Sequence, residues 1–194
     1  MIIFDFDGVI SDSAKWFDDV ATYLAGAHGA DARLVLEWMI TQASASWIGG
    51  SWSDATFIEE LNTSLSITAT IEELNAACRG TMRIDPRIRS LIETLGPIAI
   101  FTDNPNVRAC MIAEAFPSAR VTASYAVGAR KYEPGGFAGF SKRSGITSGL
   151  FIDDFPRNIE AARAAGFDAL RWQLNKDTYS VLEEHIRTYR ANDA

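Results

Sequence analysis

Four short apolar runs, separated by long stretches of mixed sequence, constrain the fold of this chain more than any other feature. They span residues 1–4, 97–101, 125–128 and 149–152, and three of them lead directly into polar groups. Continuous apolar runs of this length are typical of strands buried on both faces of a parallel sheet. Ligands of such sheets bind at the carboxyl ends of the strands, so these polar groups are expected to meet at one edge.

Helical spacing dominates residues 13–83, where no convincing strand occurs. Apolar residues recur on one helix face between Trp16 and Leu24, and Thr70 with Glu73 forms a capping box that opens a later helix. This block is therefore expected to form a compact all-helical unit.

From Asp85 onwards, predicted helices alternate with the remaining apolar runs. Asp85 and Pro86 supply an N-cap and a first helical residue, which marks the first of these helices. Strands that alternate with helices form a doubly wound sheet by the crossover rule. The sequence therefore predicts an α/β fold: a doubly wound, Rossmann-like parallel sheet core of residues 1–12 and 84–194, with a small all-helical cap domain of residues 13–83.

Composition excludes several classes of protein. The 194 residues are 47% hydrophobic, enough for one sizeable core and a small accessory domain, and the net charge of −7 argues against a nucleic-acid partner. No apolar run approaches the ~18 residues of a membrane span, and the first residues already form a predicted strand, which leaves no room for a signal peptide. Cys78 and Cys110 lack metal-ligand spacing and are expected to be buried thiols of a reducing compartment, with a single disulfide as the alternative. We expect a soluble, cytoplasmic protein, and nothing in the chain indicates its oligomeric state.

The first apolar run ends in two carboxylates, Asp5 and Asp7, followed by Gly8. In a regular strand, residues i and i+2 point the same way, and glycine lets the chain turn sharply past a ligand. One carboxylate can attack a phosphorus atom and form an aspartyl-phosphate, while the other exchanges a proton with the leaving oxygen and with water. Most such acid pairs are solvated or cap turns, but the position at the end of an apolar strand favours the catalytic interpretation.

A second acid pair, Asp153 and Asp154, follows the run at residues 149–152. Two adjacent acids repel one another unless a cation lies between them and the first pair. Oxygen-only ligands favour Mg²⁺ over zinc. The alternative is that Asp154 only caps the helix that opens near Pro156, which leaves Asp153 unexplained.

Thr102 and Lys131 follow the other two runs. The Thr102 hydroxyl can donate to a phosphoryl oxygen, although threonine is also common at helix starts. A lone lysine is normally a surface residue. Hydrolysis of phosphate monoesters needs an acceleration approaching ~10²¹-fold, whereas one acid–base group supplies about 10²–10⁴-fold, so the groups are expected to act as a set.

These residues, in this order, resemble the four motifs of the haloacid dehalogenase (HAD) superfamily, and most closely its phosphatases with a helical cap inserted after the first strand (subfamily I). Residues 5–13 resemble the first motif, Thr102 the second, residues 131–134 the third and residues 153–162 the fourth. Tyr132 replaces the proline of the third motif. The resemblance covers nearly the whole chain.

The resemblance implies Asp5 as the nucleophile and Asp7 as the general acid/base. It implies that the Asp5 carboxylate, the Asp7 carbonyl and Asp154 bind Mg²⁺, with Asp153 as a further ligand or a residue that orients one.

The resemblance implies that Thr102 and Lys131 hold and neutralise the phosphoryl group. The residues expected to bind the phosphate are Gly8, Thr102, Asp103 and Lys131. Asp103 replaces the asparagine that often follows the threonine of the second motif. It would place an extra negative charge near the phosphate unless its side chain turns away to cap the helix at Pro105.

The implied activity is that of a Mg²⁺-dependent phosphomonoester hydrolase acting on a small phosphorylated metabolite through an aspartyl-phosphate. The dehalogenases lack an acid at the position of Asp7, and the phosphonate-cleaving relatives use a cap lysine, for which only Lys15 is near. Sugar-phosphate mutases keep a histidine early in the first cap helix, where this chain has Trp16 and Phe17. A mutase and a non-catalytic relative that binds a ligand or protein stay as alternatives, and only Asp103 favours the latter.

The cap is expected to choose the substrate. It is rich in aromatic residues, most of which are expected to form its own core and its seam with the sheet. Residues 49–50 are two glycines able to hinge a loop into the site. Arg33, Arg79 and Arg83 either meet a second anionic group or lie solvated.

Overall fold

The parallel sheet predicted from the apolar runs forms the centre of the molecule. The computed structural model describes residues 1–192, and its five parallel strands follow the spatial order β3-β2-β1-β4-β5. The strands are β1 (Ile2–Phe4), β2 (Ala99–Thr102), β3 (Arg120–Ala123), β4 (Leu150–Asp153) and β5 (Asp168–Arg171). β1 lies in the middle, with Phe4 paired to Ile100 on one side and to Ile152 on the other. The predicted doubly wound α/β fold is confirmed.

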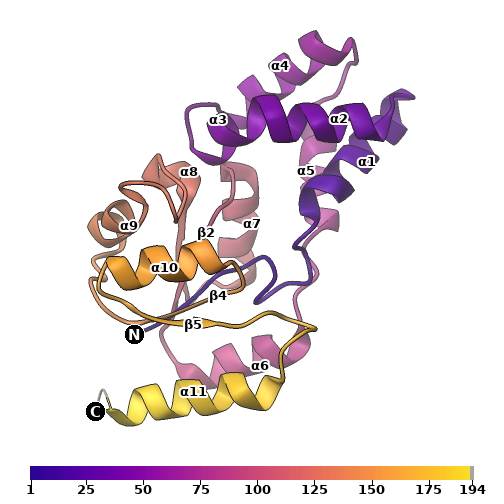
Figure 1. Cartoon of the computed structure of the whole chain (residues 1–194). Coiled ribbons are helices and arrows are strands. Elements are labelled where there is room, and N and C mark those ends of the chain that lie inside the picture. The colour runs from indigo at the N-terminus through magenta and orange to yellow at the C-terminus, as the bar shows by residue number, and fades with distance from the viewer. Residues whose placement is uncertain (193–194) are drawn as a thin grey trace.

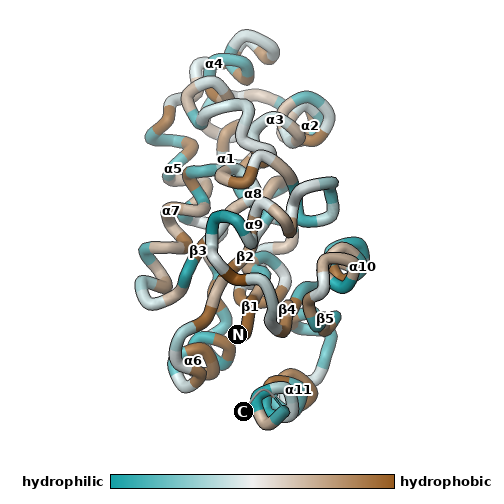
Figure 2. Tube along the Cα trace, turned by 90° about the vertical axis from the view of Figure 1, so that its left-hand side faces the viewer, coloured by the Kyte–Doolittle hydropathy of each residue, from teal (hydrophilic) through white to brown (hydrophobic). Residues whose placement is uncertain are grey.

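Helices cover both faces of this sheet, because successive strand residues point to opposite sides. Ile2 and Phe4 pack into one cluster with two of the helices, and Ile3 packs into a second cluster with two others. The first face carries α6 (Pro86–Leu95) and α11 (Tyr179–Asn192), and the second carries α9 (Gly136–Ser144) and α10 (Pro156–Ala164). Figure 2 shows hydrophobic residues along β1 and β4, flanked by helices on which hydrophobic and hydrophilic residues alternate.

The elements between β1 and α6 are all helices, apart from isolated bridges at Asp7, Ser11 and Ile84. The helices are α1 (Trp16–His28), α2 (Ala32–Trp38), the π-helical turn η1 (Met39–Ala43), α3 (Ser44–Ile48), α4 (Asp54–Leu65) and α5 (Ile71–Gly80). We call these elements the helical segment; Figure 1 shows them gathered above the sheet. The capping box of Thr70 and Glu73 forms as predicted.

Aromatic side chains hold the helical segment together. The rings of Trp47 and Phe57 are fully buried and stacked with centroids 3.8 Å apart, and Trp16 and Trp38 lie in the same cluster. This cluster extends onto α7 (Asn106–Ala115) of the sheet domain through Val107 and other residues. The expectation that most rings form a core and a seam is therefore confirmed.

The prediction of a strand at residues 125–128 is wrong. The strand of this region is β3, which ends at Ala123, and Ser124–Val127 form a short helix, α8, closed by Gly128 with φ +82°. β3 lies at the sheet edge and is partly exposed, so it lacks a continuous apolar run. A four-residue apolar run cannot distinguish a strand from a helical turn.

Two smaller expectations are decided by packing. Cys78 is buried but Cys110 is exposed, and both thiols are free. Gly50 adopts φ +81° and lies against the Tyr125 carbonyl of α8, while Ile48 O accepts a hydrogen bond from Ser124 Oγ at 2.9 Å. The predicted hinge thus sits in a contact between the helical segment and α8. Within residues 1–192, no helix combines the length and the apolar character that a membrane span needs.

Candidate active site

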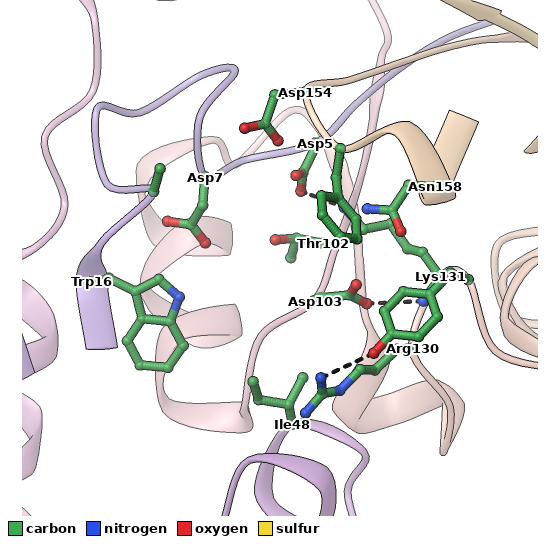
Figure 3. A pocket seen from close by; sticks show the side chains of 13 residues that line it. Asp5, Asp7, Trp16, Ile48, Thr102, Asp103, Arg130, Lys131, Asp154 and Asn158 are labelled. Carbon is green, nitrogen blue, oxygen red and sulfur yellow. Dashed lines mark hydrogen bonds and ion pairs between the residues drawn. The ribbon is translucent and has the colours of Figure 1, made fainter. Parts of the chain in front are cut away.

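The carboxyl edge of the sheet carries a cavity of about 270 Å³. Figure 3 shows side chains from separate parts of the chain converging on it. Its lining includes six of the residues singled out in the sequence, namely Asp5, Asp7, Thr102, Asp103, Lys131 and Asp154. Trp16 and Ile48 reach it from the helical segment. Strand ends therefore bring the predicted residues together, as the crevice rule for parallel sheets requires.

Lys131 lies at the buried end of this cavity with only 1% of its surface exposed. Its Nζ is 2.7 Å from Asp5 Oδ1 and donates to Asp153 Oδ2 at 2.7 Å. Burial by itself lowers the pKa of a lysine, but the charges of Asp153 and Asp5 reverse this and raise the pKa of Lys131 above its ordinary value. Lys131 is therefore a permanent cation between two carboxylates.

Asp5 follows β1 directly and is buried. Its Oδ1 accepts a 2.7 Å hydrogen bond from the Phe6 N–H in addition to the contact with Lys131. Within residues 1–192, Oδ2 makes no hydrogen bond. Burial raises the pKa of Asp5 well above its usual value, and Lys131 opposes that shift. One oxygen of Asp5 is thus held, and the other is available.

Asp153 ends β4 and is fully buried. Besides Lys131, it accepts hydrogen bonds from the Phe155 N–H at 2.8 Å and from Asn158 Nδ2 at 3.0 and 3.1 Å. These contacts fix its carboxylate behind Lys131.

Asp154 lies at the cavity wall, and the helix-cap alternative for it is wrong. α10 begins after Phe155 without any side-chain cap. Burial, followed by the charge of Asp153, raises the pKa of Asp154 to about 6. Gly8 adopts φ +84°, and a Cβ there would lie 2.6 Å from Asp154 Oδ2, so only glycine permits this approach.

The donor set of this acidic cluster fits a divalent cation. Carboxylate oxygens of Asp5, Asp153 and Asp154 all lie within 4.8 Å of one another. The pKa values of Asp5 and Asp154 are raised because burial and neighbouring acids disfavour their charged forms. Hard oxygen ligands in this number are those that Mg²⁺ prefers.

Thr102 ends β2 and is fully buried. Its Oγ1 accepts a 2.7 Å hydrogen bond from Asn104 Nδ2, so its own proton is available to a group in the cavity. Asp103 Oδ1 accepts from the Lys131 N–H at 3.0 Å, and the expectation that Asp103 caps the next helix is wrong. Burial raises the pKa of Asp103, and the Lys131 charge opposes that shift.

The sequence patterns did not reveal Arg108, a fully buried cation on α7. Its Nη2 donates to Asp7 Oδ1, its Nε donates to Asn104 Oδ1 at 2.7 Å, and its Nη1 donates to Thr81 Oγ1. The guanidinium also lies 4.4 Å from the ring centroid of Trp16. The sequence signal that could have revealed Arg108 is its position on the helix face of α7 that also carries the buried residues Val107, Met111 and Ile112.

Asp7 is held from several sides. Besides Arg108, its Oδ1 accepts from Ser13 Oγ, and its Oδ2 accepts from Asn104 Nδ2 at 2.7 Å. Asp7 therefore has a fixed orientation in the cavity wall, separate from the Lys131 cluster.

None of the three arginines considered for a second anionic group reaches the cavity. Arg33 is exposed, Arg79 pairs with Glu114 and Arg83 pairs with Asp19. They belong to the solvated surface.

Comparison with known proteins identifies the fold. No model of a protein family and no curated protein matches the sequence. Solved structures do match. A HAD-like family hydrolase from Porphyromonas gingivalis is 20% identical, with 96% of this chain and 97% of that chain covered and a TM-score of 0.72.

Two further solved structures share this fold. A HAD family enzyme from Bacteroides thetaiotaomicron, in complex with magnesium and inorganic phosphate, is 14% identical, covers 93% of this chain and 97% of its own, and has a TM-score of 0.72. The L-2-haloacid dehalogenase of Xanthobacter autotrophicus is 16% identical, with 96% and 82% covered and a TM-score of 0.62. The chain has the fold of HAD-like hydrolases.

Proposed function

We propose that this protein is a Mg²⁺-dependent phosphomonoester hydrolase that acts on a small phosphorylated metabolite through an aspartyl-phosphate. The observation that carries the proposal is the arrangement of Asp5, whose Oδ1 is held by Lys131 while its other oxygen is available at the cavity. A carboxylate in that state is a nucleophile beside a fixed positive charge.

The first half-reaction follows from this geometry. Asp5 Oδ2 attacks the phosphorus atom, the bond to the leaving oxygen breaks, and Asp7 gives that oxygen a proton. Lys131 and the Thr102 hydroxyl hold the phosphoryl oxygens at the positions where charge develops. In the second half-reaction a water attacks phosphorus, Asp7 takes its proton, and the bond to Asp5 breaks to release phosphate.

Asp5, Asp154 and the Asp7 main-chain carbonyl would hold the Mg²⁺ ion, with Asp153 as a further ligand or the residue that orients Lys131. When bound, the ion neutralises charge on the phosphoryl oxygens. The acidic cluster supports this assignment, and the structural neighbour from Bacteroides thetaiotaomicron was solved with magnesium and inorganic phosphate.

The chain is proposed to comprise a core domain, residues 1–12 and 84–194, and a cap domain, residues 13–83. The hydrophobic cluster centred on the helical segment, which extends to α7, supports this division. Trp16 and Ile48 of that segment line the cavity, so the cap contributes to the choice of leaving group. The protein is proposed to act in the cytoplasm.

Haloacid dehalogenases share this fold, so dehalogenation is the second candidate function. Asp7 lines the cavity together with Lys131, and Asp5 and Asp154 in its wall cluster with the buried Asp153. An acid/base group and a cation site serve phosphoryl transfer, and these residues therefore favour a phosphate ester over a halogenated acid.

The test is phosphate release from para-nitrophenyl phosphate, with Mg²⁺ and with chelator, for the wild type and Asp5→Asn. We expect release that needs metal and that Asp5→Asn abolishes, while the exposed neighbour variant Asp12→Asn keeps it. Normal turnover by Asp5→Asn would contradict the assignment of Asp5 as the nucleophile. Chloride release from 2-chloropropionate without phosphate release would establish the dehalogenase instead.

A further inference from the structure

Two cations line the cavity, and Arg130 is the one that forms no ion pair within residues 1–192; the charge of Arg130 acts on the nearby Asp103 without a direct contact between the two side chains. Lys131, its neighbour in the chain, is held between Asp5 and Asp153. Arg130 is half-buried, and within the described residues it forms no ion pair. A cation in this state at a ligand cavity is available to an anion from outside.

The guanidinium is also short of hydrogen-bond partners. Its Nη1 donates to the Tyr132 hydroxyl at 3.1 Å, whereas its Nε is buried without an acceptor. A buried N–H left unsatisfied is costly, so the side chain gains by turning toward an acceptor that enters the cavity. Carboxylate and phosphate oxygens match the planar fork of arginine best.

The position of Arg130 in the cavity indicates that it contacts the leaving group of the substrate and not the phosphoryl group. In Figure 3 its guanidinium lies beside Ile48, at the opposite end of the view from Asp154. The phosphoryl group belongs near Asp5, Thr102 and Lys131, so the other part of the ester extends toward Arg130 and the helical segment.

Charge makes such a cation necessary. Asp5, Asp7, Asp103 and Asp154 all line the cavity, and an ester with a second negative group would be repelled without a compensating charge at that end. The cavity of about 270 Å³ has room for a small phosphate ester with a second anionic group.

We propose that Arg130 forms a subsite for an anionic group, a carboxylate or a second phosphate, on the leaving alcohol of the substrate. This inference rests on the proposed phosphatase function and names the class of ester that the site takes. Tyr132 orients the guanidinium from the side, and Ile48 closes the subsite from the helical segment.

The test uses esters that differ in one group. Glycerol 3-phosphate carries a hydroxymethyl group where 3-phosphoglycerate carries a carboxylate, and glycerol 1,3-bisphosphate carries a second phosphate at the same end. We expect the wild type to have a kcat/KM about 10–100-fold higher for one of the two esters with a second anionic group than for glycerol 3-phosphate. A gain of this size is what a charge-assisted hydrogen bond contributes. The preferred ester distinguishes carboxylate from phosphate.

Arg130→Met should remove most of this preference, because methionine keeps much of the length but not the charge. Arg130→Lys should keep part of it. Arg143→Met, which removes an exposed arginine of α9, is the matched control and should keep the wild-type preference. A wild type that hydrolyses all esters with equal kcat/KM overturns the subsite. An Arg130→Met variant whose kcat/KM falls by the same factor on every ester overturns it as well.

Failure of the proposed function is distinguishable from failure of the subsite. A wild type inactive on every ester, para-nitrophenyl phosphate included, contradicts the phosphatase proposal. Calorimetric binding of 3-phosphoglycerate and glycerol 3-phosphate to Asp5→Asn then tests Arg130 without turnover. Preferential binding of the anionic ester that Arg130→Met abolishes supports the subsite, and equal binding of the two esters rejects it.

Discussion

Lys131 and Arg108 are both buried cations at the carboxyl edge of one sheet, but their surroundings differ. Lys131 lies between the carboxylates of Asp5 and Asp153. Arg108 meets one carboxylate, that of Asp7, together with two neutral oxygen acceptors and the ring of Trp16. The lysine is a compact charge on a flexible stem, whereas the guanidinium is a rigid fork.

The difference indicates a division of labour at the site. Two acids around one lysine leave an excess of negative charge, which suits a site that receives a cation and a phosphoryl group. One acid held by an arginine, an amide and a hydroxyl is neutralised and oriented. Under the proposed function, Lys131 would set the charge of the reacting end, and Arg108 would set the position of Asp7, the proposed acid/base.

The largest effect is expected for Lys131→Met. It removes a donor to the phosphoryl group, and kcat/KM for para-nitrophenyl phosphate should fall about 10²–10³-fold. It also leaves Asp5 and Asp153 without their partner, and breaking a buried pair costs about 3–5 kcal/mol of unfolding free energy. Lys142→Met, at an exposed position of α9, is the control and should match the wild type. Turnover within tenfold of wild type would show that Lys131 does not act on the phosphoryl group.

Magnesium should stabilise the protein through the acidic cluster beside Lys131, and this stabilisation should not depend on Arg108. At a Mg²⁺ concentration 100 times the Kd, the free energy of unfolding should rise by about 2.7 kcal/mol, and chelator should reverse the change. Asp154→Asn should abolish this increment, since it removes a ligand of the acidic cluster.

Urea unfolding with and without Mg²⁺ measures the increment for the wild type, Asp154→Asn and Arg108→Met. Arg108→Met should keep it. An increment lost in Arg108→Met but kept in Asp154→Asn would place the cation beside Asp7 and reverse the comparison.

Arg108→Met should lower kcat about 10–100-fold with little change in KM, because a misplaced acid/base impairs the chemical step rather than binding. The decisive measurement is a double-mutant cycle with Asp7→Asn. In the Asp7→Asn background, Arg108→Met should cause no further loss of kcat. An equal loss in both backgrounds would mean that Arg108 supports the fold rather than Asp7.

The smallest effect concerns Cys78, a buried thiol near Arg108. Burial raises the pKa of Cys78 from 9.0 to about 12, with the Arg108 charge opposing the shift. Between these values the unfolded chain loses the thiol proton while the folded protein keeps it, so stability falls as pH rises. The free energy of unfolding should drop by about 1.4 kcal/mol per pH unit above about pH 9 from this group.

Urea unfolding under reducing conditions at pH 8, 9 and 10 measures that slope. Cys78→Ala should show a shallower fall than the wild type, whereas Cys110→Ala, which removes the exposed thiol, should not. Equal slopes of unfolding free energy against pH for all three proteins would mean that water reaches Cys78, and that the surroundings of Arg108 are solvated.

Local sequence patterns correctly predicted those elements whose conformation depends on residues close together in the chain. The central strands, the capping box at Thr70 and the cap at Asp85 are of this kind. The residues at strand ends also followed, since a parallel sheet brings its carboxyl ends together whatever the helices do. Residues 125–128 failed because the edge strand beside them is only half-buried and has no apolar pattern of its own.

By itself, then, the sequence determined the doubly wound sheet and the meeting of Asp5, Thr102 and Asp154 at its edge, since these follow from strand burial and strand direction. Lys131 reaches the same cavity from the stretch after α8 and not from a strand end. Only the tertiary structure decided that Arg108 holds Asp7, because the two residues stand 101 positions apart and no local pattern links them. It also decided that Asp103 turns to the Lys131 backbone and that Arg130 lines the cavity without an ion-pair partner among residues 1–192. Contacts of this kind depend on how helices pack over the sheet, which the sequence encodes only through the whole fold.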